Sequence, residues 1–157
     1  MAGLRELYQN VILEHNRSPR NYRAMPDANR EAQGHNPLCG DQVTVRLRVE
    51  DGRIQDAAFQ GMGCAISRAS ASIMTAAIKG RTPEEAAELF QQFHRLVTGH
   101  PEAGNPETLG KLAVFSGVSA YPIRVKCASL PWHTMCSSSS RANTISSSSI
   151  ARPPSDC

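Results

Sequence analysis

The sequence predicts a fold that combines an antiparallel β-hairpin with several helices. Apolar and polar residues alternate strictly over 43–50, Asp51-Gly52 follows, and a returning strand is expected over 54–60. Helices are indicated on both sides of this hairpin by apolar residues at three- and four-residue steps. A chain of 157 residues is expected to form one domain with its own hydrophobic core.

A first helix is predicted near the N-terminus, where five apolar side chains recur at helical spacing: Leu4, Leu7, Tyr8, Val11 and Ile12. Pro19 ends it, because the residue before a proline is disfavoured in the helical conformation. Residues 18–38 are expected to form an irregular lead-in rich in proline and glycine, in which a third strand has no clear pattern.

Further helices are predicted after the hairpin. Gly61-Met-Gly-Cys64 leads into a helix over 65–79, which Gly80 ends. Its apolar face is expected to comprise Ile66, Ala69, Ile73, Ala76, Ala77 and Ile78. Thr82-Pro-Glu-Glu85 is a capping box with proline at the first helical position, and it opens a helix that runs to about Val97. A loop over 98–106, a shorter helix over 106–115 and an extended segment over 121–127 are expected to follow.

Composition and charge exclude several classes of protein. The net charge is +3, and no run of Lys and Arg is interleaved with aromatic residues, which argues against nucleic-acid binding. No apolar run is long enough to cross a bilayer, and the N-terminus does not resemble a signal peptide. We therefore expect a cytoplasmic protein without membrane contacts, whose thiols stay reduced. The odd count of five cysteines also argues against a complete disulfide framework.

The composition changes after His133. Two serine runs and Pro153-Pro154 follow, without the apolar periodicity that folding requires. We therefore expect a domain over 1–135 and a disordered, serine-rich tail over 136–157. Cys136 and Cys157 fall in this tail and are assigned no role.

Four residues at the boundaries of predicted elements are candidates for a common site: Cys39, Asp41, Cys64 and Cys127. Such boundaries are where functional groups usually lie. Thiolates with a carboxylate make a plausible tetrahedral zinc site, or a starting point for iron–sulfur ligation. The alternative is that each cysteine is a small buried apolar residue and that Asp41 is a turn residue. Spacing alone does not decide between them, because there is no C-x-x-C motif.

Cys64 has a second reason to be reactive, since the N-terminus of a helix favours a thiolate. The glycines before it allow a tight turn and leave room for a metal or a partner. His35 is close to Cys39 in sequence and is a candidate neighbour of the site. No two histidines lie at the spacing of metal ligands.

Several motifs together resemble one family. They are Gly34-His-Asn-Pro-Leu-Cys-Gly-Asp41, Gly61-Met-Gly-Cys-Ala-Ile-Ser67, Ala69-Ser-Ala-Ser72 and Arg124-Val-Lys-Cys-Ala-Ser-Leu-Pro-Trp-His133. In this order they resemble the SufU-type iron–sulfur cluster assembly proteins of the larger IscU-like, or NifU N-terminal, family. The resemblance runs from about residue 4 to 135, and the N-terminal helix with Ser18-Pro-Arg-Asn21 fits it.

The resemblance implies an α+β fold in which a small antiparallel three-stranded sheet packs against helices. It implies that Cys39, Asp41, Cys64 and Cys127 are metal ligands, with zinc as cofactor and a transient iron–sulfur cluster as a further possibility. It also implies that Cys39 accepts persulfide sulfur from a PLP-dependent cysteine desulfurase of the SufS type. Zinc would keep the thiols deprotonated and protected until that partner takes over a coordination position.

Two features favour the SufU-type branch over IscU-type scaffolds. Lys126 stands where IscU-type chains have a histidine before the last cysteine, and an insertion typical of SufU-type chains falls around 82–105. Arg124 matches a family position beside the site and is a candidate for partner docking, or else a solvated basic side chain. This branch is expected to act as a sulfurtransferase-like partner of the desulfurase rather than as a stand-alone enzyme.

Two alternatives to the sulfur acceptor stay open. One is a scaffold that assembles a [2Fe–2S] or [4Fe–4S] cluster and passes it to downstream carriers or apoproteins. The other is a structural zinc module. Family members normally continue into a C-terminal helix rich in Ala, Leu and Glu, so the serine-rich end of this chain resembles a frameshifted or altered terminus.

Overall fold

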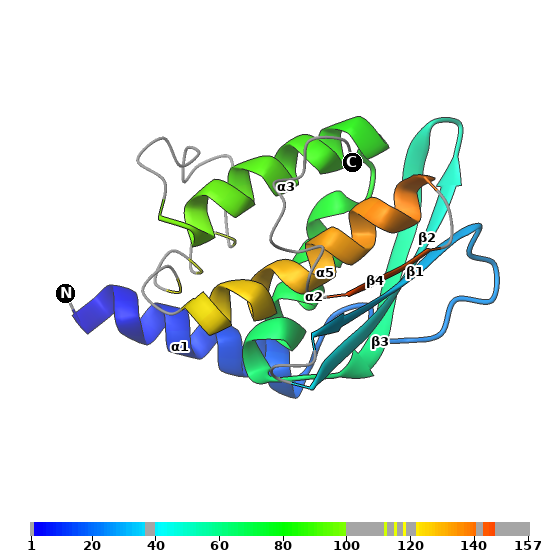
Figure 1. The fold of residues 1–157 in the computed structure, drawn as a ribbon. Helices are drawn as coiled ribbons and strands as arrows, with labels where there is room; N and C mark the ends of the chain where they lie inside the picture. The colour runs from blue at the N-terminus through cyan, green and yellow to red at the C-terminus, as the bar shows by residue number, and fades with distance from the viewer. Residues whose placement is uncertain are drawn as a thin grey trace.

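The computed structural model describes residues 2–36, 40–99, 112, 115, 118, 122–140 and 143–146. Its elements are α1 (Ala2–Arg17), β1 (Arg30–Asn36), β2 (Asp41–Glu50), β3 (Arg53–Met62), α2 (Ala65–Ile78), α3 (Pro83–Val97), α5 (Pro122–Ser140) and β4 (Asn143–Ser146). The strands form one sheet in the order β3-β2-β1-β4. Figure 1 shows this sheet with the helices gathered on one side of it.

The predicted hairpin is confirmed as β2 and β3. These strands pair antiparallel, with Glu50 opposite Arg53, so the connection is the two-residue loop Asp51-Gly52. Both loop residues have positive φ, 54° and 74°, as a type I′ turn requires. The alternation over β2 predicted one buried face, and Val43, Val45 and Leu47 are indeed buried on the face that the helices cover.

The lead-in contains β1, the third strand that had no clear pattern in the sequence. β1 pairs antiparallel with β2 and completes the three antiparallel strands of the expected α+β fold. Its buried positions are Ala32, Gly34 and Asn36. A strand that buries alanine, glycine and asparagine shows almost no alternation of hydrophobicity, which is the signal that predicts strands.

The fourth strand lies in the segment that was expected to be a disordered tail. β4 pairs parallel with β1 over Ala32–His35, and α5 extends to Ser140. Residues 141–142 and 147–157 lie outside the described residues. The division of the chain at residue 135 therefore stays a prediction.

Two helices cover the sheet directly. α5 lies against β1 and β2, and α2 lies against β3, while α1 packs on α2 and α3 packs on α5. α2 begins and ends close to the predicted positions, but it is buried on more than its apolar face. Ser70 donates to the Ala128 carbonyl (2.6 Å) and accepts a hydrogen bond from Trp132 Nε1 (3.1 Å). Ala76, which was placed on the apolar face, is exposed.

The capping box of α3 is confirmed. Thr82 Oγ1 accepts from the Glu85 N–H and the Glu85 carboxylate accepts from the Thr82 N–H, each at 3.1 Å. Beyond this cap, α3 brings Phe90 and Phe93 against Trp132 of α5, with ring centroids 5.9 and 4.8 Å apart. This aromatic cluster joins the two helices in the core.

The extended segment expected over 121–127 is helical, so that prediction was wrong. α5 begins at Pro122, and proline is favoured at the first position of a helix because its missing N–H would have no helical partner there. Alternation of Ile123, Arg124, Val125 and Lys126 resembled a strand, yet every residue over 127–135 is buried. Burial between the sheet and α3 overrides the local preference.

The predicted loop over 98–106 and helix over 106–115 lie largely outside the described residues. Beyond Gly99, the described residues up to the start of α5 are Leu112, Phe115 and Val118, and all three are buried in the core. None of the helices in the described part of the chain is long and apolar enough to cross a membrane.

The close approach of α5 to β1 predicts a strict size limit at Gly34. A Cβ atom there would lie 2.0 Å from Thr134 Oγ1 and 3.0 Å from Leu130 Cδ1. Gly34→Ala is therefore expected to lower the free energy of unfolding by about 1–3 kcal/mol, the usual cost of overpacking. Urea denaturation measures it. The double variant Gly34→Ala/Thr134→Ala should recover part of the loss, and a single variant as stable as the parent would contradict the packing.

Burial of His133 predicts a loss of stability in acid. Burial, with the charge of His94 as a smaller cause, lowers the pKa of His133 to about 4, whereas an unfolded histidine titrates near 6.5. Between these values the unfolded chain binds a proton that the folded chain does not, so stability falls as the pH falls through this window. One pKa unit corresponds to about 1.4 kcal/mol, which gives a loss of about 2–3 kcal/mol between pH 7 and 4.5.

The measurement is urea denaturation of zinc-free protein at several pH values between 4.5 and 7. The matched variant is His133→Phe, which keeps a ring beside Phe90, whose centroid lies 4.8 Å from that of His133. The variant should show a flatter dependence of stability on pH. Equal slopes for the two proteins would show that His133 does not carry the effect.

Candidate metal centre

Three candidate ligands from three separate elements meet at one end of the sheet. Asp41 is the first residue of β2, Cys64 precedes the first turn of α2, and Cys127 lies in α5. One ligand atom of each lies within 4.8 Å of the others, and this is the only such group of three or more potential ligands within the described ranges. The predicted convergence of these three residues is therefore present.

The Asp41 carboxylate is fully buried. Its Oδ1 accepts a hydrogen bond from the Cys64 backbone N–H at 2.9 Å, and its Oδ2 lies 3.8 Å from Cys64 Sγ. The approach is close because residue 63 is glycine, where a Cβ would lie 3.0 Å from Asp41 Oδ1. The carboxylate thus binds to the start of α2 as well as facing the thiols.

Cys64 is the N-cap residue of α2, and its side chain accepts from the Ser67 N–H at 3.5 Å. A hydrogen bond from the Cys127 thiol is the main cause that lowers the pKa of Cys64, to about 7. Burial opposes this shift and the Ser67 N–H supports it. The prediction that a helix N-terminus favours the Cys64 thiolate agrees with this direction. Cys64 is also exposed, so a reagent or partner can reach it.

Cys127 was expected at the end of an extended segment, but it lies in a helix. Its side chain is buried, on the stretch of α5 that lies against the sheet. Ser70 of α2 donates to the carbonyl of the next residue, Ala128, at 2.6 Å. This bond ties the part of α5 that carries Cys127 to the helix that carries Cys64.

The remaining candidates differ in what the structure says of them. Cys39 lies outside the described residues. His35 is exposed on β1 and does not belong to the ligand group. Arg124 is exposed and Lys126 is half-buried, both on the first turns of α5 ahead of Cys127. Their roles at the site stay predictions.

The donors present fit a zinc ion. Two thiols and one carboxylate, placed on separate rigid elements, match the sulfur and oxygen ligands that zinc accepts, and they leave a fourth tetrahedral position for another donor. In the buried Asp41 carboxylate, one oxygen accepts from the Cys64 N–H and the other faces the Cys64 thiol. A cation bound between that second oxygen and the thiol would offset the cost of burying the charge.

Sequence reasoning missed two contributors to this centre. The Ser67 N–H, which bonds to Cys64 Sγ, follows from the N-cap geometry and could have been inferred once the helix start was known. Tyr22 contacts the glycine segment before Cys64 through its hydroxyl. It directly follows Ser18-Pro-Arg-Asn21, but nothing in its sequence surroundings signals that contact.

Comparison with known proteins agrees with this geometry. Residues 7–128 match the family described as NifU-like N terminal domain. The chain is 38% identical to the zinc-dependent sulfurtransferase SufU of Bacillus subtilis, covering 85% of this chain and 90% of that protein. It is 35% identical to the iron–sulfur cluster assembly scaffold protein IscU of Streptococcus pyogenes, covering 86% and 84%.

Solved structures show the same fold. The N-terminal part of a nitrogen-fixing NifU-like protein from Brucella abortus aligns with a TM-score of 0.72 at 28% identity, covering 84% of this chain and 91% of that one. A protein of Fervidobacterium islandicum, described as an iron–sulfur cluster assembly scaffold for the SUF system, aligns with a TM-score of 0.77 at 33% identity, covering 83% and 94%. The chain belongs to the NifU-like N-terminal domain family of iron–sulfur cluster assembly proteins.

Proposed function

We propose that this protein is a zinc-dependent sulfur acceptor in iron–sulfur cluster assembly, and that Cys39 receives persulfide sulfur from a PLP-dependent cysteine desulfurase of the SufS type. The observation that carries the proposal is the convergence of Asp41, Cys64 and Cys127 within 4.8 Å. Cys39 is two positions before Asp41 in the chain and is the proposed fourth ligand.

The sulfur transfer is an exchange between thiols. The Cys39 thiolate attacks the outer sulfur of the donor's persulfide, a new sulfur–sulfur bond forms on Cys39, and the donor's cysteine leaves as a thiolate. No electrons are gained or lost overall. As in thiol–disulfide exchange, the rate depends on the thiolate fraction of the attacking cysteine and on access to it.

Zinc, when bound, would stabilise the thiolates of the site and protect them from oxidation. The chain's own contribution is to hold the remaining ligands in place while Cys39 is used. Asp41 is held by the Cys64 N–H, Cys64 by the start of α2, and Cys127 by a buried stretch of helix. Each of these three side chains therefore has a support of its own among the described residues.

The partners follow from the same chemistry. The desulfurase is the sulfur donor, and downstream cluster carriers or apoproteins are the acceptors. Exposed Arg124, together with Lys126 and His35, is proposed to lie beside the docking surface for the donor. A cytoplasmic location suits a site of reduced thiols.

A cluster-building scaffold is the second candidate, because the same family includes relatives named as IscU scaffolds. Lys126 favours the sulfur acceptor, since a lysine ammonium cannot ligate iron as an imidazole does. A protein that rejects zinc but assembles a coloured cluster on Cys64 and Cys127 would establish the scaffold instead.

The Cys39 thiol predicts stimulation of the desulfurase. Zinc-loaded protein added to its cysteine desulfurase is expected to raise cysteine turnover, and Cys39→Ala is expected to abolish this effect, because the thiol proposed to accept the sulfur is removed. Cys136→Ala is the matched control and should stimulate like the parent. Bound zinc without any stimulation would leave a structural zinc module, and equal stimulation by both variants would exclude Cys39 as the acceptor.

The Asp41 carboxylate predicts a charge requirement for zinc. Asp41→Asn keeps an oxygen that can accept from the Cys64 N–H, but it removes the negative charge that a cation needs. Zinc affinity, measured by competition with a chromophoric chelator, is expected to fall more than about tenfold while the fold persists. Asp56→Asn is the control. It removes a carboxylate of β3 that forms ion pairs with Arg23 and Lys79, and it should leave zinc affinity unchanged. An unaltered affinity in Asp41→Asn would remove this residue from the ligand set.

A further inference from the structure

We propose that Tyr22 is a positioning residue of the metal centre, which holds Cys64 in place through the glycine segment Gly61–Gly63. This rests on the proposed function in that it concerns the same zinc site. Tyr22 belongs to the lead-in between α1 and β1, far from Cys64 in sequence, and it is not itself a ligand. It acts on the backbone that connects β3 to α2.

The Tyr22 hydroxyl is hydrogen-bonded to both backbone polar groups of one residue, Gly61. It donates to the Gly61 carbonyl at 2.9 Å and accepts from the Gly61 N–H at 3.4 Å. Gly61 has φ of 150°, and a Cβ there would lie 2.1 Å from the Gln42 carbonyl oxygen. A side chain would therefore not fit at Gly61, which pairs with Val43 near the end of the edge strand β3. The tyrosine supplies hydrogen bonds that a further strand would otherwise give on the open side of β3.

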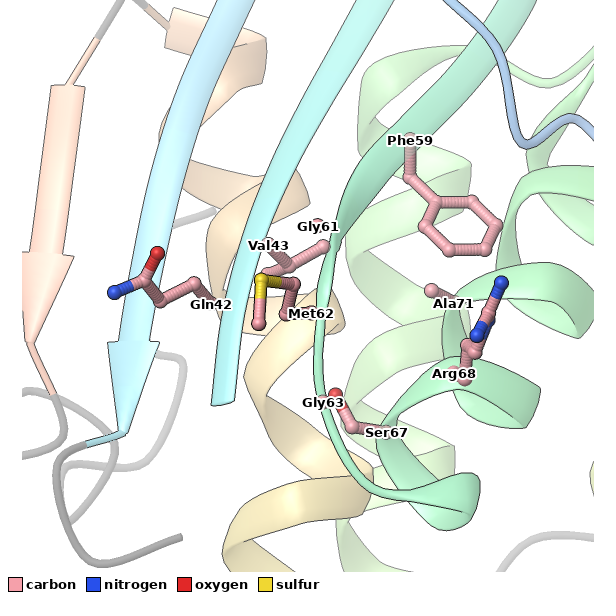
Figure 2. Close-up of a pocket in the computed structure, with 9 residues that line it drawn as sticks. All are labelled: Gln42, Val43, Phe59, Gly61, Met62, Gly63, Ser67, Arg68 and Ala71. Carbon is pink, nitrogen blue, oxygen red and sulfur yellow. The ribbon is translucent and has the colours of Figure 1, made fainter. Parts of the chain in front are cut away.

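The Tyr22 ring contacts the other end of the same connection. The guanidinium carbon of Arg68 lies 5.0 Å from the ring centroid, and Arg68 sits one turn into α2, where its N–H bonds to the Cys64 carbonyl at 3.1 Å. Figure 2 shows Gly61 and Gly63 on the segment that descends from β3, and Arg68 on the helix that follows. Tyr22 thus bridges the residues on both sides of Cys64.

The ring of Tyr22 and the backbone beside it are held against β3 by contacts that do not involve the metal site. Its ring meets Phe59 edge-on at 5.2 Å, and its neighbours pair with β3 through Phe59 N–H to the Asn21 carbonyl (3.0 Å) and Arg23 N–H to the Phe59 carbonyl (3.2 Å). Because β3 anchors the tyrosine at Phe59, the hydroxyl fixes the chain at Gly61, one residue before β3 ends at Met62, and so sets where the chain leaves the strand. That exit decides where Cys64 meets Asp41 and Cys127.

The chain offers a matched control for loss of such a clamp. Asn29 also binds both backbone groups of a single residue, Val49, at 2.7 and 2.8 Å. Val49 lies near the turn at the opposite end of the sheet from the metal centre. Asn29→Ala therefore removes an equivalent clamp without touching the connection to Cys64.

The experiment compares Tyr22→Phe with Asn29→Ala. Zinc affinity is measured by chelator competition, ligand geometry by the visible absorption of the cobalt(II)-loaded protein, and stability by urea denaturation. Tyr22→Phe is expected to lower zinc affinity about tenfold, the lower end for groups that orient metal ligands, and to shift the cobalt bands. Asn29→Ala should lower stability yet leave both metal readouts unchanged.

Two further outcomes decide the proposal. Zinc affinity within twofold of the parent and an unchanged cobalt spectrum in Tyr22→Phe would overturn it and leave the tyrosine a purely structural residue. If Tyr22→Phe does not fold, Arg68→Met carries the test, with an expected loss of zinc affinity of about threefold. No desulfurase is used, so a chain that binds zinc without stimulating a desulfurase would contradict the proposed function alone.

Discussion

The hydrogen bond from the Cys64 N–H to the buried Asp41 carboxylate is the interaction on which the metal centre depends. It joins the first residue of β2 to the first turn of α2 at 2.9 Å, so it links the sheet to the helix layer at the point where the thiols gather. A buried carboxylate is costly unless it is bonded, and the N-terminus of a helix is a favourable place for its charge. The same bond that stabilises this acid also holds it beside the thiols of Cys64 and Cys127.

The sequence alone located candidate site residues where local patterns define the ends of helices and strands. The hairpin over β2 and β3 and the start of α2 follow from alternation, a type I′ turn signal and a glycine approach, and these patterns place Asp41 and Cys64 at element boundaries. Their contact was not accessible, because it depends on how α2 packs against the sheet. The resemblance to a known family supplied the grouping that spacing alone left undecided.

The missing pattern of β1 and the wrong prediction for α5 share a physical cause. β1 buries small and polar residues because α5 passes too close for larger ones, so its pattern of hydrophobicity is nearly absent. The first residues of α5 alternate like a strand, but the burial of 127–135 selects a helix. In both cases the packing of α5 against β1 decided the outcome, and that contact joins distant parts of the chain. Cys127 was therefore grouped with Asp41 and Cys64, which it does approach, although its element was predicted wrongly.

The three candidate ligands come from different segments, so metal binding by them would depend on the packing of β2, α2 and α5 against one another. A metal bound by Asp41, Cys64 and Cys127 closes one short and one long loop of polypeptide, and such cross-links restrict the unfolded ensemble most when the loops are long. Metal occupancy of the site then depends on folding, and the stability of the fold depends on metal occupancy. A slight separation of α5 from the sheet would therefore move Cys127 away from Asp41 and Cys64 and weaken the hold on a bound metal, with no change in the candidate ligands themselves.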